Sequence, residues 1–245
     1  MKLLAAVLAV LVLLTAVYKS IYSTTSYRVR LTLNVETPQG LKTGSGVVEV
    51  TTRSYPAWTT LGGSTGNSWV TGDAVFVDLG EGANGRERYL VALLASGLRG
   101  EDVDFYRLPM LAYEHLWRRG DHSSDWRDPN LELSKLPPGT RVELSGKLIP
   151  TLVTFFDTRD PNTARVVRPD GLAQSFGDTV HLRDVTLETV SSGIWPLNAL
   201  GLTGEPITRG IETHLPFLVT QRDRLRRLID DLPPRFQPHY HLFTR

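Results

Sequence analysis

The chain has 245 residues and a formal net charge of +1, from 27 Lys and Arg against 26 Asp and Glu. Apolar residues make up 41% and charged residues 22%, which excludes a collagen-like chain, a long coiled coil, a polytopic membrane protein and wholesale disorder. The balanced charge provides no overall positive field and no nucleic-acid-binding motif is present, so we expect no nucleic-acid partner.

An uncharged apolar run opens the chain and predicts a membrane anchor. Lys2 precedes it, residues 3–17 carry no charge, and the candidate cleavage site near Thr24 and Ser26 lies far from the run. A helix over residues 3–22 would be about 30 Å long, enough to span a bilayer. We predict a transmembrane anchor over residues 1–22, with a cleaved signal or a buried helix of a soluble domain as alternatives. The expected membrane and interface residues are Leu3, Leu8, Leu13, Tyr18, Lys19 and Tyr22.

The charges that flank this run leave its orientation open. Lys2 favours a cytoplasmic N-terminus, whereas Lys19, Arg28 and Arg30 argue against it. Signal-like N-termini usually direct export, and the absence of cysteine is compatible with an exported bacterial domain. We therefore expect a single-pass protein of the bacterial inner membrane, with its main domain on the periplasmic side. The missing cysteines also exclude a disulfide framework and Cys-ligated zinc.

The next segment alternates between apolar and polar residues with period two. This alternation over residues 27–36 predicts a strand with one buried face, and Pro38-Gln39-Gly40 predicts a turn. A returning strand through Val47, Val48 and Val50 completes a hairpin just beyond the predicted anchor.

Further strands are expected across residues 23–218, which we assign to a mostly-β extracytoplasmic domain. They are predicted at 69–79, 88–94, 142–148, 151–156 and 180–190, with a short helix near 110–118. The expected fold class is mainly β, a sandwich or barrel-like arrangement with α+β details. The tetrapeptide Arg-Asp-Pro-Asn occurs at 127–130 and 159–162 and predicts two turns.

Residues 219–245 differ in character from the β domain. Leu225, Leu228, Ile229 and Leu232 recur at helical spacing among arginines, which predicts a basic amphipathic helix before an aromatic tail. The tail either packs on its own domain or reaches a partner. The partner-docking candidates are Arg222, Arg226, Phe236, Tyr240 and Phe243.

Two polar clusters contain side chains that can bind metal ions, although the metal is unknown. The candidates are His122, Asp125 and Asp128 in one loop and His239 and His241 in the tail. Their spacing matches no metal motif, so solvated or packed side chains are the favoured interpretation.

Ser64 lies in a Gly-x-Ser-x-Gly pattern, which in serine hydrolases forms a strand-to-helix turn. No hydrophobic strand precedes it and no helix follows, so a flexible loop is favoured. We expect no cofactor and assign no catalytic residue.

Several stretches together resemble an uncharacterised bacterial protein family with an apolar N-terminus. They are residues 27–38, 43–50, 152–161 and 207–218. The resemblance implies a membrane-anchored or exported domain, and it implies no catalytic residue because the family has no established activity.

The function predicted from the sequence is that of a non-catalytic, membrane-anchored accessory or interaction subunit of a membrane protein assembly. Its expected partners are the lipid bilayer and other membrane protein subunits. Two alternatives remain open. One is an exported ligand-binding domain with an apolar pocket between its sheets, and the other is a metal- or serine-dependent hydrolase.

Overall fold

A computed structural model supplies the fold. The structure describes residues 23–55, 66–82, 85, 87–97, 103–117, 128–177, 179–194, 197–198, 200–221 and 243–244. The predicted anchor, Ser64 and the predicted C-terminal helix lie outside these ranges. Within them, no helix is both long enough and apolar enough to cross a membrane.

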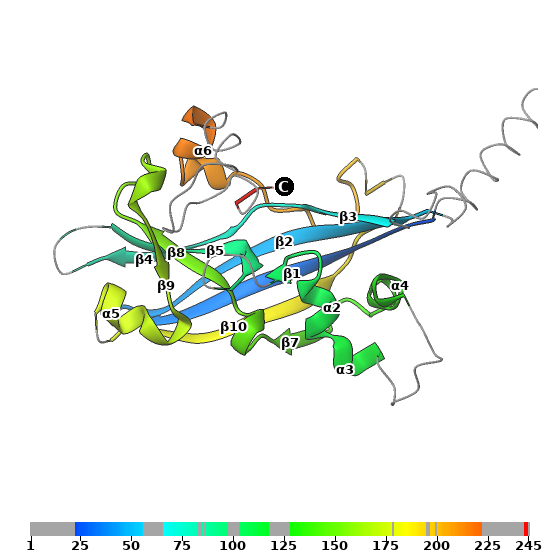
Figure 1. Cartoon of the computed structure of the whole chain (residues 1–245), viewed down its shortest axis with the longest axis horizontal. Coiled ribbons are helices and arrows are strands. Elements are labelled where there is room, and N and C mark those ends of the chain that lie inside the picture. Colours follow the sequence, from blue (N-terminus) through cyan, green and yellow to red (C-terminus); the bar gives the residue numbers. More distant parts are fainter. Residues whose placement is uncertain are drawn as a thin grey trace, which may run out of the picture.

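Two antiparallel sheets form the molecule, which confirms the mainly-β prediction (Figure 1). The strand order of the first sheet is β3(Gly66–Thr71), β2(Gly40–Ser54), β1(Ser23–Thr37), β10(His181–Val190), β7(Arg141–Glu143). The order of the second sheet is β4(Val75–Glu81), β5(Glu87–Ser96), β8(Pro150–Phe155), β9(Ala164–Val167), and β6(Val103–Asp104) also pairs with β5.

The predicted hairpin is the longest element of the fold. β1 and β2 pair from Ser23–Ser54 to Thr37–Gly40, so a two-residue turn joins them. The alternation predicted from the sequence is confirmed, because the apolar side chains of β1 from Tyr27 to Val35 are buried on one face. The polar residues between them lie on the outer face, where Arg28 pairs with Glu49 at 2.8 Å.

Short helices connect the strands and cover the edges of the core. The α-helices are α2(Leu108–Ala112), α3(Glu114–Trp117), α4(Pro129–Ser134), α5(Leu172–Phe176) and α6(Phe217–Thr220). The 3-10 helices are η2(Gly146–Leu148), η3(Pro161–Thr163), η4(Pro169–Gly171) and η5(Ile211–Thr213).

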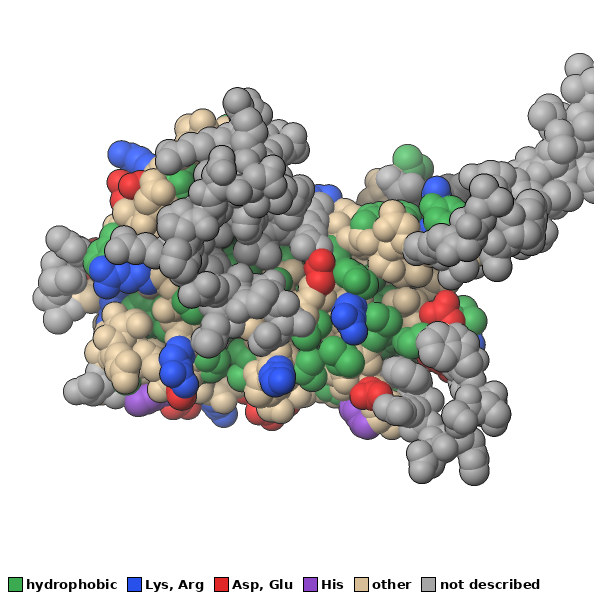
Figure 2. All heavy atoms as spheres, in the orientation of Figure 1, with side chains coloured by type: hydrophobic (Ala, Val, Ile, Leu, Met, Phe, Trp, Pro, Cys, Tyr) green, Lys and Arg blue, Asp and Glu red, His purple; other side chains and the backbone are tan. Residues whose placement is uncertain are grey.

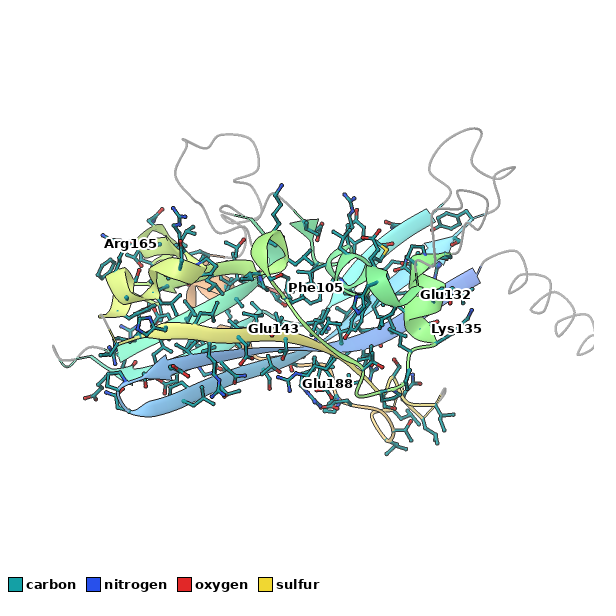
Figure 3. The ribbon with its side chains drawn as sticks, turned by 90° about the horizontal axis from the view of Figure 1, so that it is seen from below. Phe105, Glu132, Lys135, Glu143, Arg165 and Glu188 are labelled. Atoms are coloured by element: carbon teal, nitrogen blue, oxygen red, sulfur yellow. The ribbon has the colours of Figure 1, made fainter. Side chains whose placement is uncertain are left out.

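The main core fills the space between the two sheets. Valine and leucine side chains from both sheets meet there and are almost fully buried, as are Tyr113 and Phe105. Figure 3 shows Phe105 near α2. The backbones of β4 and β2 approach closely where the two strands cross, because β2 has a glycine at the crossing. A Cβ at Gly44 would meet the Phe76 carbonyl oxygen and lie 2.6 Å from Val77 Cγ2.

A second core lies on the opposite face of the second sheet. Residues 205–211 cross the outer face of the first sheet, where Thr208 N donates to Val47 O at 2.9 Å. The chain then covers the second sheet with Ile211, Leu215 and Phe217, and Phe243 packs among them. Ala74 N donates to Phe243 O at 2.6 Å, so the described part of the C-terminus is fixed to β4.

Three local expectations need correction. The strand predicted over 69–79 is broken at residues 72–74, because Gly72 has φ +145° and Asp73 turns inward to accept a hydrogen bond from Ile211 N at 3.2 Å. The strand predicted over 142–148 shortens to β7, and η2 follows it. Asp128 and Asp160 form N-caps of α4 and η3 in place of free turns, since each carboxylate accepts a bond from the amide two residues on.

Candidate functional site

The long hairpin gives the molecule two distinct ends. We define the proximal end as the one where β1 begins at Ser23, and the distal end as the turn at Pro38 and Gln39. β1 has 15 residues. At ~3.3 Å per residue the two ends lie about 45 Å apart. Figure 3 shows this separation, because Arg165 lies toward the distal end and the Glu132–Lys135 pair of α4 toward the proximal end.

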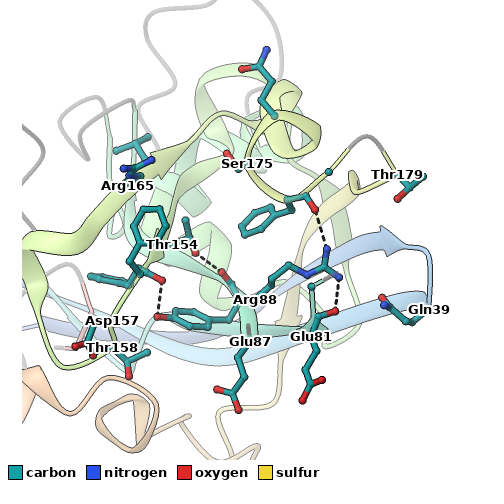
Figure 4. A pocket seen from close by; sticks show the side chains of 18 of the residues that line it. Gln39, Glu81, Glu87, Arg88, Thr154, Asp157, Thr158, Arg165, Ser175 and Thr179 are labelled. Atoms are coloured by element: carbon teal, nitrogen blue, oxygen red, sulfur yellow. Dashed lines mark hydrogen bonds between the residues drawn. The ribbon is translucent and has the colours of Figure 1, made fainter. Parts of the chain in front are cut away.

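An open groove of about 1410 Å³ lies at the distal end (Figure 4). The hairpin turn, the facing ends of β4 and β5, the end of β8, β9 and α5 all contribute to its lining. We call it the distal groove. Its residues come from segments far apart in sequence, and no motif in the sequence connects them.

One side of the groove carries a like-charge pair. Glu81 on β4 and Glu87 on β5 face each other directly in register, and both are exposed. Neither has an ion-pair partner among the described residues. Like charges placed opposite each other on neighbouring strands destabilise a sheet. This pair therefore costs stability and offers two carboxylates to a cation.

Positive charge and an exposed ring lie across the sheet from those carboxylates. Phe156 is 63% exposed, and the Arg165 guanidinium carbon lies 4.3 Å from its ring centroid. Arg159 follows in the next turn and also lines the groove. In the described parts of the chain neither arginine has a carboxylate partner. The ring of Phe156 thus orients the Arg165 guanidinium, and the N–H groups of that guanidinium remain available to bind a partner.

Arg88 and Tyr89 are neighbours on β5 between these two groups, and they project to opposite faces of the second sheet. Arg88 donates to the carbonyls of Phe176 at 2.9 Å and Glu81 at 3.1 Å, and its buried Nε has no partner. Tyr89 donates to Phe155 O at 3.1 Å. Burial, with smaller contributions from nearby acidic residues, raises the pKa of the Tyr89 phenol above its ordinary value. Tyr89 therefore remains a protonated donor and is unsuited to act as a base.

The described lining of the groove contains hydroxyl groups and carboxylates, and it contains no histidine. Among the described residues no group of three or more His, Asp or Glu side chains is placed to hold a metal. Charged side chains of both signs are scattered over the face shown in Figure 2, as expected for a chain without an overall positive field.

The candidate residues from the sequence do not form this site. Asp128 is occupied as the N-cap of α4, where it accepts from Asn130 N at 3.0 Å. Phe243 is fully buried in the second core, so the ring packs on its own domain and is corrected from a docking candidate to a core residue. The other candidates lie outside the described residues: His122, Asp125, His239, His241, Arg222, Arg226, Phe236 and Tyr240.

None of the groove residues is singled out as a site residue by the sequence. Phe156 falls at the end of the strand predicted over 151–156, and a single apolar residue at a strand end is common on protein surfaces. No family model matches the chain, and neither the curated proteins nor the solved structures include a significant match.

Proposed function

We propose that this protein is a membrane-anchored, non-catalytic interaction subunit whose distal groove binds a segment of a partner protein. The observation that carries the proposal is the groove itself. It combines two facing carboxylates, unpaired arginines and an exposed phenylalanine on a rigid sheet. The facing carboxylates cost stability in the free chain, and a partner of matching charge removes that cost.

The partner segment that fits best carries both signs of charge. A lysine or arginine of the partner would pair with Glu81 and Glu87, and an acidic group would pair with Arg165. β9 pairs only with β8 among the described strands, so its outer edge is open to backbone hydrogen bonds from an extended chain. An extended, mixed-charge segment can satisfy the side chains and this edge together.

The proposed location follows from the apolar N-terminal run. Residues 1–22 are proposed to anchor the chain in the bacterial inner membrane, with the β domain on the periplasmic side. β1 begins immediately after this segment. The distal groove would then stand about 45 Å beyond the end of the anchor, at ~3.3 Å per strand residue. This geometry suits a subunit that reaches a neighbour in a membrane assembly.

The space between the sheets does not favour a ligand pocket. The ligand-binding alternative expects an apolar cavity there, but side chains such as Leu31, Leu90 and Leu152 fill it and are almost fully buried. The proposal therefore places recognition at the distal groove.

The proposal is tested by isolating the full-length protein from its native membrane in mild detergent. We expect a companion at fixed stoichiometry with the natural chain, and its loss with Arg165→Glu. Arg183→Glu is the matched control, because this exposed arginine lies on β10 of the other sheet and approaches Glu36 only at 3.9 Å. Purification as a bare monomer, or equal retention of the companion by both variants, contradicts the proposal.

A further inference from the structure

An uncharged loop extends from the proximal end of the molecule. Residues 191–204 follow β10 and contain no Asp, Glu, Lys or Arg. We call this segment the apolar loop. Four of its aliphatic side chains face solvent, with exposed fractions of 70% for Ile194, 41% for Leu197, 70% for Leu200 and 69% for Leu202. Scattered apolar residues are common on surfaces, but this concentration on one segment indicates an interaction site.

The base of the apolar loop is held tightly. Glu205 N donates to Ser191 O at 2.8 Å, and Ile194 N donates to Thr203 Oγ1 at 3.0 Å. Gly193 and Gly204 have φ values of +76° and +81°, and a Cβ at Gly204 would lie 2.6 Å from Gly193 N. The two sides of the loop therefore touch through their backbones, which only glycine permits.

The described residues near the tip of the apolar loop also bond to one another. Asn198 N donates to Ile194 O at 2.9 Å, and Leu202 N donates to Leu197 O at 3.0 Å. Asn198 Nδ2 donates to Ser192 O at 3.1 Å. These bonds tie the described residues Ile194 and Leu197 to Asn198 and Leu202 within the loop.

Ion pairs fix the apolar loop to the first sheet. Arg28 Nη1 donates to Glu205 O at 2.6 Å, and Arg30 pairs with the Glu205 carboxylate. Arg30 also pairs with Glu188 on β10 at 3.4 Å. Both ends of the loop therefore lie beside Arg28 of β1.

The direction of the loop places it beside the start of β1. Val190, the last residue of β10, pairs with Arg28, and β10 runs antiparallel to β1. A chain that continues past Val190 therefore heads toward Ser23, which follows the apolar run at residues 3–17. In Figure 1 the yellow to orange segment after β10 rises near β3 in the half of the molecule where β1 begins.

A second amphipathic feature lies at the same level of the first sheet. Trp69 on β3 pairs with Thr51, which pairs with Ser26. The Arg53 guanidinium carbon lies 5.8 Å from the Trp69 ring centroid. Tryptophan beside arginine is typical of the boundary between bilayer and water, where the ring is buried and the cation meets headgroups.

We propose that the apolar loop inserts into the interfacial layer of the same bilayer that holds residues 1–22. This inference rests on the membrane anchoring in the proposed function and adds a second contact to it. The apolar loop and the proposed anchor both continue from the proximal end of the first sheet. A bilayer that holds the anchor therefore lies close to the apolar loop. Inserting Ile194, Leu200 and Leu202 removes apolar surface from water.

The chemistry of the loop favours lipid over a protein partner. A protein interface normally combines apolar contacts with polar groups at its rim. The apolar loop has no charged residue, and its backbone bonds are largely satisfied internally. The large side chains that are exposed among its described residues are aliphatic, which suits an acyl-chain boundary.

The test uses the full chain in vesicles of phosphatidylethanolamine and phosphatidylglycerol. The chain has no cysteine, so a single introduced cysteine carries one environment-sensitive fluorophore. We expect the label at Leu200→Cys to be quenched several-fold more by nitroxide-labelled lipids than the label at Leu41→Cys. Leu41 is the matched control, because it is a half-exposed leucine beside the distal turn.

A third label separates failure of this inference from failure of the proposed anchoring. If Leu13→Cys is quenched by lipid but Leu200→Cys behaves like Leu41→Cys, the anchor stands and the loop inference is overturned. If Leu200→Cys is shielded from aqueous iodide without quenching by lipid, a second copy covers the loop and the inference is also overturned. Quenching of Leu200→Cys without Leu13→Cys would support the loop contact and reject the anchor.

Discussion

The two ends of the β1–β2 hairpin expose apolar surface in different ways. At the proximal end, the apolar loop presents four aliphatic side chains with no charged residue within the loop. At the distal end, Phe156 lies under the Arg165 guanidinium in a groove that Glu81 and Glu87 also line, and these charges have no ion-pair partner among the described residues. The first surface suits the lipid bilayer, which offers no partners for charged groups. The second suits a protein segment that carries charges of its own. The chemistry around an exposed apolar group, more than its size, indicates what covers it.

The proximal and distal ends can act at a fixed separation only if the sheets between them are rigid. The hairpin runs through both regions, and β4 packs directly on β2 at Gly44, four residues after β2 begins at the distal turn. Each prediction below tests either this connection or the difference between the ends.

The largest expected effect on the free energy of unfolding comes from disrupting the close packing of β4 on β2 at Gly44. In Gly44→Val the new Cβ meets the Phe76 carbonyl, which is backbone and cannot rotate away. We expect a loss of about 3 kcal/mol or more in the free energy of unfolding. Chemical denaturation measures it. Gly46→Ala is the milder comparison, because its Cβ would lie 3.1 Å from the Val75 Cγ2 methyl. Equal stability of Gly44→Val and the natural chain would contradict the close crossing.

The next effect contrasts two phenylalanines. Phe243→Ala removes a fully buried ring from the second core, with an expected cost of about 3–5 kcal/mol. Phe156→Ala removes an exposed ring and should change stability by less than about 0.5 kcal/mol. Thermal and denaturant unfolding compare the two. Phe156→Ala should nevertheless weaken retention of the partner, and a large stability loss there would show that the ring is structural.

Alkaline pH is expected to lower the free energy of unfolding by an intermediate amount, through one buried tyrosine near each end. Burial raises the pKa of Tyr27 near the proximal end and of Tyr89 in the distal groove, with nearby carboxylates adding to it. In the unfolded chain a tyrosine ionises near pH ~10. Above that pH the unfolded state binds fewer protons than the native state, so stability falls as pH rises.

The expected slope for each such tyrosine is up to about 1.4 kcal/mol per pH unit above pH ~10. Unfolding midpoints measured between pH 8 and 11 test this range. Tyr27→Phe and Tyr89→Phe should each reduce the slope. A variant slope equal to that of the natural chain would show that the corresponding phenol ionises in the folded protein.

The smallest effect on stability is expected in the apolar loop. Leu200→Ser and Leu202→Ser change side chains that are mostly exposed, so each should alter the free energy of unfolding by less than about 0.5 kcal/mol. In vesicles, the double variant should reduce lipid quenching of a label at Ile194→Cys. A large loss of stability in solution would instead show that these leucines pack on the domain.

The strands could be predicted because their side chains alternate locally. Residues 27–36 and 181–190 show this pattern, and β1 and β10 bury the apolar residues as expected. The Arg-Asp-Pro-Asn repeat also carried a correct local signal for polar backbone capping. Its outcome as two N-caps depended on whether a helix followed, which the tetrapeptide alone does not determine.

The site could not be predicted because it depends on contacts between distant segments. Glu81 and Glu87 become opposed only through strand register, and Arg165 reaches Phe156 only when β8 and β9 pair. Leu200 and Leu202 resemble core residues in the sequence, and only the loop geometry places them outside. Phe243 shows the reverse, since an aromatic residue in a tail proves to be part of a core.

The most direct test of the two-ended arrangement measures the height of each end above the bilayer. Energy transfer from donors at Leu200→Cys and Gln39→Cys to acceptor lipids at the vesicle surface compares them within the full chain. We expect efficient transfer from Leu200→Cys and weak transfer from Gln39→Cys, because the distal turn lies about 30 Å beyond the level of Arg28, where the loop leaves the sheet, at ~3.3 Å per strand residue. Equal transfer from both positions would mean that the domain lies flat or stands free of the membrane, and it would contradict the account.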